Sequence, residues 1–287
     1  MLKQRVLTAI VLLVALYVVT AWLPPVYFAI FLTLALVPAL LEWARLMGLV
    51  RWSAKLVWLA LFGALLGLCM WALQSGTEAS GRAGLIWLNA AALGFWLLVF
   101  WLIHQYPAGQ ARWSAVWQIG AMGIACLLPT WVGLYYLKAW APSGVLVFTL
   151  IALVSVVDIG AYFTGRAWGR SKLAPALSPN KSWAGFWGGV ACCVALSAAL
   201  LTGLQAATGR LPLSLWALLI LATVLMAVVS VVGDLFESML KRHRGIKDSG
   251  RILPGHGGVL DRIDSLVAAT PVFVLAILLL GNVLDIL

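Results

Sequence analysis

Long apolar runs recur along the chain, separated by short polar interruptions. A helix needs about 20 apolar residues to cross the ~30 Å hydrocarbon core of a bilayer. Runs of about this length predict nine spans, at 6–23, 26–44, 56–74, 84–103, 114–137, 144–165, 184–206, 213–236 and 266–286. The first two are separated only by Leu23-Pro24-Pro25, so a re-entrant hairpin is the alternative there. The pattern predicts an all-α, polytopic integral membrane protein with about nine transmembrane helices.

Composition supports the same class. Hydrophobic residues make up 64% of the 287 residues and charged residues 10%, whereas soluble domains carry about a quarter charged residues. A water-soluble fold is therefore excluded. The net charge of +10 is better explained by basic loops that meet anionic lipid headgroups than by nucleic acid. We expect membrane lipids and no nucleic acid among the partners.

Basic residues are distributed unevenly between the two sets of predicted loops. With a cytoplasmic N-terminus, the outer loops contain Arg82, Lys138 and Arg210. The inner segments contain Lys3, Arg5, Arg45, Arg51, Lys55, Arg112, Arg166, Arg170, Lys172, Lys181, Lys241, Arg242, Arg244, Lys247, Arg251 and Arg262. This positive-inside bias predicts a multi-pass protein of a bacterial inner (cell) membrane, with its N-terminus in the cytoplasm and its C-terminus outside.

The chain divides by its polar content. Residues 1–137 are expected to form about five transmembrane helices, and residues 138–287 a catalytic transmembrane region with two cytoplasmic motif loops, at 166–183 and 238–265.

Gly63 and Gly67 form a G-x-x-x-G pair, which is typical of closely packed helices. We expect that contact within the monomer and leave a homodimer open.

Acidic residues are rare, and most lie in the second half of the chain. A charge within a span costs about 2.5–3.5 kcal/mol on insertion scales and indicates function by default. Glu42, Glu78 and Asp285 lie nearer loops or ends and are expected to be solvated. The other six lie at or near predicted cytoplasmic span ends: Asp158, Asp234, Glu237, Asp248, Asp261 and Asp264.

The first motif region begins at a predicted span end. Asp158 and Tyr162 are four residues apart and share a helix face. Gly165 and Gly169 follow, among Arg166, Arg170, Lys172 and Lys181. A basic, glycine-rich turn suits phosphate binding. An ordinary juxtamembrane basic loop is the alternative.

The second motif region combines acids, bases and glycines within 32 residues. Asp234, Glu237 or Ser238, and Lys241 have helical spacing and form one stripe. Asp261, Asp264 and Ser265 form another at the start of the last helix, and 255–258 reads Gly-His-Gly-Gly. Facing carboxylates with nearby cations suit Mg²⁺ bridged to a polyphosphate. Salt bridges between helices are the alternative, but they do not readily explain so many charges and glycines.

The same residues resemble the signature of the phosphatidate cytidylyltransferase family. The resemblance is carried by Ser238-x2-Lys-Arg-x4-Lys-Asp-x-Gly-x2-Leu-Pro-x-His-Gly-Gly-x2-Asp-Arg-x-Asp264. Upstream, Asp158-x-Gly-Ala-Tyr-Phe and Ser178-Pro-x-Lys-Ser-Trp also resemble the family, so the likeness is close over about 155–265. Members often carry Glu or Gln where this chain has Ala184.

The resemblance implies a metal-assisted transfer at the cytoplasmic face, in which CTP and phosphatidate give CDP-diacylglycerol and pyrophosphate. It implies Mg²⁺, with a second cation left open, held by Asp234, Asp261 and Asp264, with Asp158 as a further candidate. Asp248 and His256 would position ligands or the loop. Further candidates for binding substrate phosphates are Ser178, Lys181, Ser238, Lys241, Arg242, Lys247, His256, Gly257, Gly258 and Arg262. The predicted catalytic set is Lys181, Asp234, Lys241, Arg242, Asp248, His256, Asp261 and Asp264.

Three alternatives remain at this stage. Another CTP-dependent lipid enzyme, such as a polyprenol kinase or a cytidylyltransferase for a different lipid phosphate, would share the charged loops. A CDP-alcohol phosphotransferase is disfavoured because its Asp-Gly and Ala-Arg pattern is missing. An anion transporter would show paired halves with broken midplane helices, whereas here the polar residues concentrate at one interface.

Overall fold

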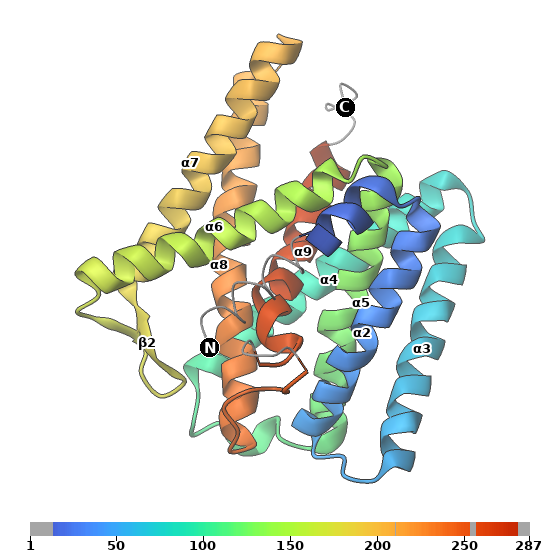
Figure 1. The fold of residues 1–287 in the computed structure, drawn as a ribbon, viewed down its shortest axis with the longest axis vertical. Coiled ribbons are helices and arrows are strands. Elements are labelled where there is room, and N and C mark those ends of the chain that lie inside the picture. The colour runs from blue at the N-terminus through green and yellow to red at the C-terminus, as the bar shows by residue number, and fades with distance from the viewer. Residues whose placement is uncertain (1–13, 210, 253–256, 281–287) are drawn as a thin grey trace.

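The fold is a bundle of long helices (Figure 1). The computed structural model describes residues 14–209, 211–252 and 257–280. Within them, eight helices are long and apolar enough to cross a membrane, and a further helical segment covers 14–22. The eight are α2 (Pro25–Met47), α3 (Trp52–Gln74), α4 (Glu78–His104), α5 (Val116–Trp140), α6 (Val145–Trp168), α7 (Trp183–Thr208), α8 (Leu213–His243) and α9 (Leu260–Leu280). The predicted polytopic all-α class is confirmed.

Local sequence explains several helix ends. Pro25 begins α2, where a missing backbone N–H costs nothing. The hydroxyl of Thr77 caps α4 by accepting from Ser80 N at 3.3 Å. The hydroxyl of Ser182 caps α7 in the same way, by accepting from Gly185 N. The helices are therefore delimited by caps as well as by hydropathy.

Three predicted boundaries can be compared with the described helices. The last span, expected at 266–286, begins six residues earlier as α9, and residues 281–287 lie outside the described residues. The segment 238–265, assigned as a motif loop, is helical at both ends, as the predicted stripes through Lys241 and from Asp261 indicate, because α8 continues to His243 and α9 begins at Leu260. Helical hydrogen bonds do not require apolar side chains, and Ser238, Met239 and Leu240 are buried there. Of the first predicted span, 6–23, residues 6–13 lie outside the described residues.

The length of α8 has a consequence for the motif residues. Its 31 residues span about 46 Å at 1.5 Å per residue, more than the ~30 Å of a hydrocarbon core. The surplus is at the C-terminal end, where residues 234–243 are mostly polar. This polar end of α8 therefore extends to the membrane surface or beyond it.

The first motif loop, expected as a flexible glycine-rich turn, contains a small β-hairpin. β1 (Lys172–Ala174) pairs antiparallel with β2 (Ser178–Ser182). In Figure 1 the hairpin lies where α6 and α7 meet. Both strands are short and β2 contains a proline, so local β-propensity is weak and the sequence pattern did not indicate strands. The β2 strand ends at Ser182, directly before α7 begins at Trp183. The start of α7 therefore fixes where the side chains of β2 lie relative to α8.

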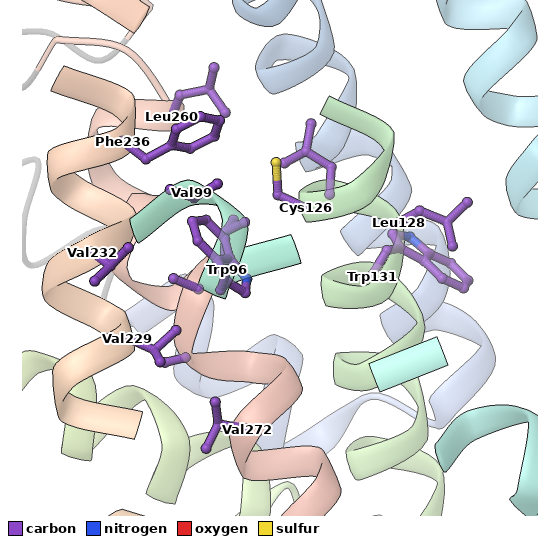
Figure 2. Close-up of a cluster of buried hydrophobic side chains, with 14 of the residues drawn as sticks. Trp96, Val99, Cys126, Leu128, Trp131, Val229, Val232, Phe236, Leu260 and Val272 are labelled. Atoms are coloured by element: carbon purple, nitrogen blue, oxygen red, sulfur yellow. The ribbon is translucent and has the colours of Figure 1, made fainter. Parts of the chain in front are cut away.

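The core lies between α4, α5, α8 and α9. Figure 2 shows Trp96, Cys126, Phe236, Leu260 and Val272 among its side chains. The rings of Trp96 and Phe236 meet edge to face, with centroids 5.7 Å apart, a favourable geometry for aromatic pairs. Phe236 lies between two acidic residues of α8 in sequence, at positions 234 and 237. The packed core thus fixes the helix segment that carries the motif.

Four connections meet at one end of the bundle. Arg244 of the α8–α9 loop contacts the end of α2, and Gln110 of the α4–α5 connection contacts His243. Arg242 Nε donates to Leu177 O of the hairpin at 3.3 Å. These are connections that the charge pattern assigns to one side of the membrane. The described contacts thus bring these connections to one end of the bundle, while their membrane side and the side that faces the cytoplasm stay predictions.

The G-x-x-x-G expectation is wrong for the monomer. A Cβ added to Gly63 or Gly67 would meet no heavy atom within 4 Å in the described structure. The two glycines lie on an exposed side of α3, where Trp58, Phe62 and Leu66 are the buried residues. The close contacts between helices involve other glycines, such as Gly233 of α8. A small-residue spacing alone does not specify which face of a helix is packed.

Candidate functional site

Helices α8 and α9 approach each other closely at Gly233, next to the motif residues. A Cβ on Gly233 would lie 2.5 Å from the carbonyl oxygen of Asp264 and 2.6 Å from Ala268 Cβ. Only glycine allows the two helices to approach this closely. The contact brings the segment of α8 that carries Asp234 beside the segment of α9 that carries Asp264.

Asp234 faces the β-hairpin. Its Oδ2 lies 2.7 Å from Lys181 Nζ, and the side chains of Asp234 and Lys181 are 33% and 23% exposed. Its Oδ1 accepts a long hydrogen bond from Ser238 Oγ at 3.4 Å, one turn along α8. The carboxylate therefore remains accessible to solvent and to ligands.

Further carboxylates surround this ion pair. Asp264 and Asp158 both interact electrostatically with Asp234 and with Lys181. Asp158 comes from the exposed side of α6, and Asp264 from the first turns of α9. Three carboxylates thus interact with the ammonium group of Lys181, and Asp264 also interacts with that of Lys241. This group of Asp158, Asp234, Asp264 and Lys181, here called the acidic cluster, has an excess of negative charge that suits a cation.

A second ionic group lies further along α8. Lys241 Nζ is 2.6 Å from Asp261 Oδ1 and 3.2 Å from Glu237 Oε2. The three side chains are 5–12% exposed. Burying charges is tolerated when they are paired in this way. Asp261 is therefore engaged with Lys241, and Asp158 lies with Asp234. Asp264 lies between the two groups, since it interacts with Asp234 and also with Glu237.

The second oxygen of Asp261 holds the loop that precedes α9. Asp261 Oδ2 accepts from Ser249 N at 3.0 Å, from Ser249 Oγ at 3.0 Å and from Gly258 N at 2.9 Å. Gly257 has a φ of +85°, a left-handed conformation that glycine adopts without strain. Gly257 and Gly258, the described glycines of this segment, thus lie against Asp261.

Glu42 of α2 joins the same loop, which the sequence prediction missed. It was expected to be solvated, and this expectation is wrong because its residue exposure is 4%. Its oxygens accept from Ser249 Oγ, Val259 N and Leu260 N at 2.8–3.0 Å. A signal was present in the sequence, since residue 42 falls inside the predicted span 26–44.

The remaining candidates lie around these two groups. Ser178 and Lys181 are on β2, and Ser238 is buried on α8. Arg242, Lys247, Asp248 and Arg262 are exposed near the start and end of the α8–α9 loop. Gly258 is buried against Glu42 and Ser249. His256 lies outside the described residues.

In the described ranges, no group of three His, Cys, Asp or Glu side chains is close enough to hold a metal ion by itself. Mg²⁺ is commonly held by one or two carboxylates together with substrate phosphates and water. The acidic cluster fits this second kind of site.

Comparison with known proteins identifies related sequences. A sequence profile of the cytidylyltransferase family matches residues 3–280. A phosphatidate cytidylyltransferase of Pseudomonas aeruginosa is 41% identical over 273 residues, which cover 95% of this chain and 96% of that protein. Those of Haemophilus influenzae and Brucella suis are 36% and 38% identical. The first match covers 95% of this chain and 97% of the relative, and the second covers 93% and 90%.

Proposed function

Because this chain belongs to the cytidylyltransferase family, we propose that it is a nucleotidyltransferase that converts CTP and phosphatidate into CDP-diacylglycerol and pyrophosphate. The observation that carries the proposal is the 36–41% identity to phosphatidate cytidylyltransferases over 93–95% of the chain. The acidic cluster beside basic residues, at the end of membrane-spanning helices, supports a reaction between a lipid phosphate and a nucleotide. The proposed enzyme acts in phospholipid biosynthesis.

The proposed reaction needs alignment and charge neutralisation. A phosphate oxygen of phosphatidate attacks the α-phosphorus of CTP in line, and the bond from that phosphorus to the bridging oxygen breaks. Pyrophosphate leaves with the electron pair. A general base is not required, because the attacking phosphate is already anionic. The protein contributes by holding two anionic substrates together, as in other phosphoryl-type transfers.

We propose that the acidic cluster holds Mg²⁺, which when bound neutralises charge on the polyphosphate. Asp234 and Asp264 are the carboxylates in the best position, with Asp158 beside them. The accessibility of Asp234 supports this assignment. For Asp261 to share the ion, Lys241 would have to move from its Oδ1. Metal binding by Asp261, and a second cation, stay predictions.

Basic residues around the cluster would bind the substrate phosphates. Lys181 lies beside Asp234 and is partly accessible, and binding of a metal or nucleotide would release its ammonium group toward a phosphate. Exposed cations at the same end of the bundle are Arg242, Lys247 and Arg262. Ser178 and Ser238 are hydroxyl candidates, and Asp248 and His256 remain candidates for positioning ligands. Lys241 would act on the phosphates indirectly, through the loop that Asp261 holds.

The reaction would take place at the cytoplasmic face. The motif-bearing loops lie at one end of the bundle together with other connections rich in Lys and Arg. Such loops face the cytoplasm under the positive-inside rule, where CTP is available. The N-terminus would then be cytoplasmic and the C-terminus outside. Reaction of a small labelling reagent with single cysteines introduced at Lys247 and Arg82, in sealed cells, tests this orientation.

Isotope position tests the reaction itself. Purified protein is incubated with phosphatidate, Mg²⁺ and CTP labelled at either the α- or the γ-phosphorus. We expect α-label in the lipid and γ-label in pyrophosphate. A polyprenol kinase would transfer γ-label to its lipid, and a cytidylyltransferase for another lipid phosphate would incorporate α-label only with that lipid. A transporter would label neither. Absence of α-labelled product from folded protein with phosphatidate contradicts the proposal.

A further inference from the structure

We propose that Glu42 is a positioning residue for the reaction and that it acts by fixing the α8–α9 loop from a different helix. Glu42 Oε1 accepts from Val259 N at 2.9 Å, and Oε2 accepts from Leu260 N at 2.8 Å. These are backbone N–H groups at the start of α9, which have no partner within the helix. A buried carboxylate on α2 thus determines where α9 begins, immediately before Asp261.

Ser249 connects Glu42 to Asp261. Its hydroxyl oxygen lies 3.0 Å from Glu42 Oε2 and 3.0 Å from Asp261 Oδ2. One hydroxyl hydrogen therefore lies between two carboxylates. Asp261 in turn binds Lys241 at 2.6 Å. A continuous chain of polar contacts runs from α2 through the loop to α8, and its ends are 199 residues apart in sequence.

The space around Glu42 is matched to a carboxylate. A Cβ on Gly250 would lie 2.1 Å from Glu42 Oε1, and a Cβ on Gly258 would lie 2.6 Å from Oε2. Both glycines belong to the loop. The loop backbone thus closes on the carboxylate from two sides, and a side chain at either glycine would displace it. This fit distinguishes Glu42 from an acidic residue that merely lies near a helix end.

Additional contacts tie the same part of α2 to the loop. Arg244 donates to the carbonyls of Leu46 and Met47 at the end of α2, and Arg45 donates to Ser249 O at 3.4 Å. The loop so held carries Lys247 and Asp248, which are exposed near the acidic cluster's end of the bundle. Glu42 contacts neither of these residues directly. It therefore acts on substrate binding through the loop backbone.

Glu42→Gln tests the proposal with little change in shape. An amide has one acceptor oxygen and a donor in place of the second, so at least one of the three donors loses its partner. We expect the KM for CTP to rise at least tenfold, while the Mg²⁺ concentration for half-maximal activity stays unchanged because Asp234 is not part of this chain of contacts. Glu78→Gln is the matched control, since Glu78 is an exposed acidic residue in the first turn of α4 and should leave kinetics unchanged.

The kinetic pattern separates positioning from a purely structural role. If Glu42 only stabilised the fold, the variant would contain fewer active molecules, so that kcat would fall and the KM for CTP would not change. That result, or unchanged kinetics altogether, overturns the proposal. The inference rests on the proposed function. Kinetics of the unmodified protein, measured in parallel, distinguish a failure of the proposed function from a failure of the role given to Glu42. A parent without product counts against the function, and a parent and variant with equal KM count against Glu42.

Ser249→Ala provides a second test that does not depend on the folding of the Glu42 variant. It removes one hydroxyl and should raise the KM for CTP in the same direction. Combined with Glu42→Gln, it should add little, because both changes interrupt the same chain. Effects on kcat/KM that multiply in the double variant would show that the two residues act independently, which contradicts the route through Ser249.

Discussion

Asp234 and Asp261 are carboxylates on facing helices, within the same polar end of the bundle, yet their surroundings differ. Asp234 is one-third exposed and has one close cation, Lys181. Asp261 is 11% exposed and binds Lys241, Ser249 and Gly258. The comparison teaches that two carboxylates of the same motif can differ in what their oxygens contact. Those of Asp234 are partly accessible, whereas those of Asp261 already accept from protein donors.

The largest expected effect concerns the accessible carboxylate. Asp234→Asn should lower activity by roughly 10²–10³-fold or more, the range found when one electrostatic group is removed from an active site. Stability should change little, because the lost ion pair is partly exposed. Activity is measured over a Mg²⁺ titration, with Glu78→Gln as the control. Retained turnover with an unchanged Mg²⁺ dependence would contradict direct participation of Asp234 in metal binding.

The buried ionic group of Lys241, Glu237 and Asp261 should matter more for stability than Asp234 does. Lys241→Met leaves Glu237 and Asp261 without their ammonium group, and breaking a buried pair typically costs about 3–5 kcal/mol. SDS titration in mixed micelles gives the free energy of unfolding. Lys181→Met is the matched variant, and it should lose activity with less than about 1 kcal/mol of stability because its pair is more exposed. Equal losses in the free energy of unfolding from Lys241→Met and Lys181→Met would contradict the difference proposed between the buried pair and the more exposed pair.

The contact between α8 and α9 should be sensitive to a single methyl group. Gly233→Ala would drive a Cβ to within 2.5 Å of Asp264 O, a backbone atom that cannot rotate away. Overpacking of this kind costs about 1–3 kcal/mol, and the shift of Asp264 should lower activity as well. The control is Gly67→Ala, where no atom lies within 4 Å. If both alanine variants behave alike in SDS titration and in activity, the close approach does not position the site.

The smallest expected effect is at Ser238. Its hydroxyl lies 3.4 Å from Asp234 Oδ1, a long hydrogen bond whose net contribution should be below about 1 kcal/mol. Ser238→Ala should therefore change kcat/KM by less than about fivefold. A larger loss would mean that the hydroxyl binds a substrate directly, as the sequence resemblance implies. The measurement is steady-state kinetics with CTP and phosphatidate varied in turn.

Much of the fold could be predicted because its signals are local. Each span is visible as an apolar run, since a helix crossing a bilayer must present apolar side chains along its whole length. The stripe of Asp234, Ser238 and Lys241 follows from helical spacing, and α8 does carry it. The apolar run that marks the last span begins later than α9 because the first turns of α9 are polar, although the stripe of Asp261, Asp264 and Ser265 already indicated a helix there. Hydropathy detects the apolar core of a helix and misses polar turns that continue it.

The partners of the motif residues were less predictable. The sequence indicated that Asp234, Asp261 and Asp264 face one another, but the helix contact at Gly233 puts Asp264 near Asp234, while Asp261 pairs with Lys241. The hairpin that carries Lys181 has no strong strand signal of its own. Its position depends on how α6 and α7 pack.

The sequence by itself determined the polytopic membrane class, the approximate positions of eight long apolar helices and the motif residues that resemble the cytidylyltransferase family. These properties are read from neighbouring positions, because hydropathy, charge and motif spacing do not depend on distant contacts. The tertiary structure alone decided which carboxylate is accessible and which is buried, and it revealed Glu42 as part of the loop. The physical reason is that a carboxylate's role depends on the donors around it, and helix packing brings those donors from positions up to 218 residues away.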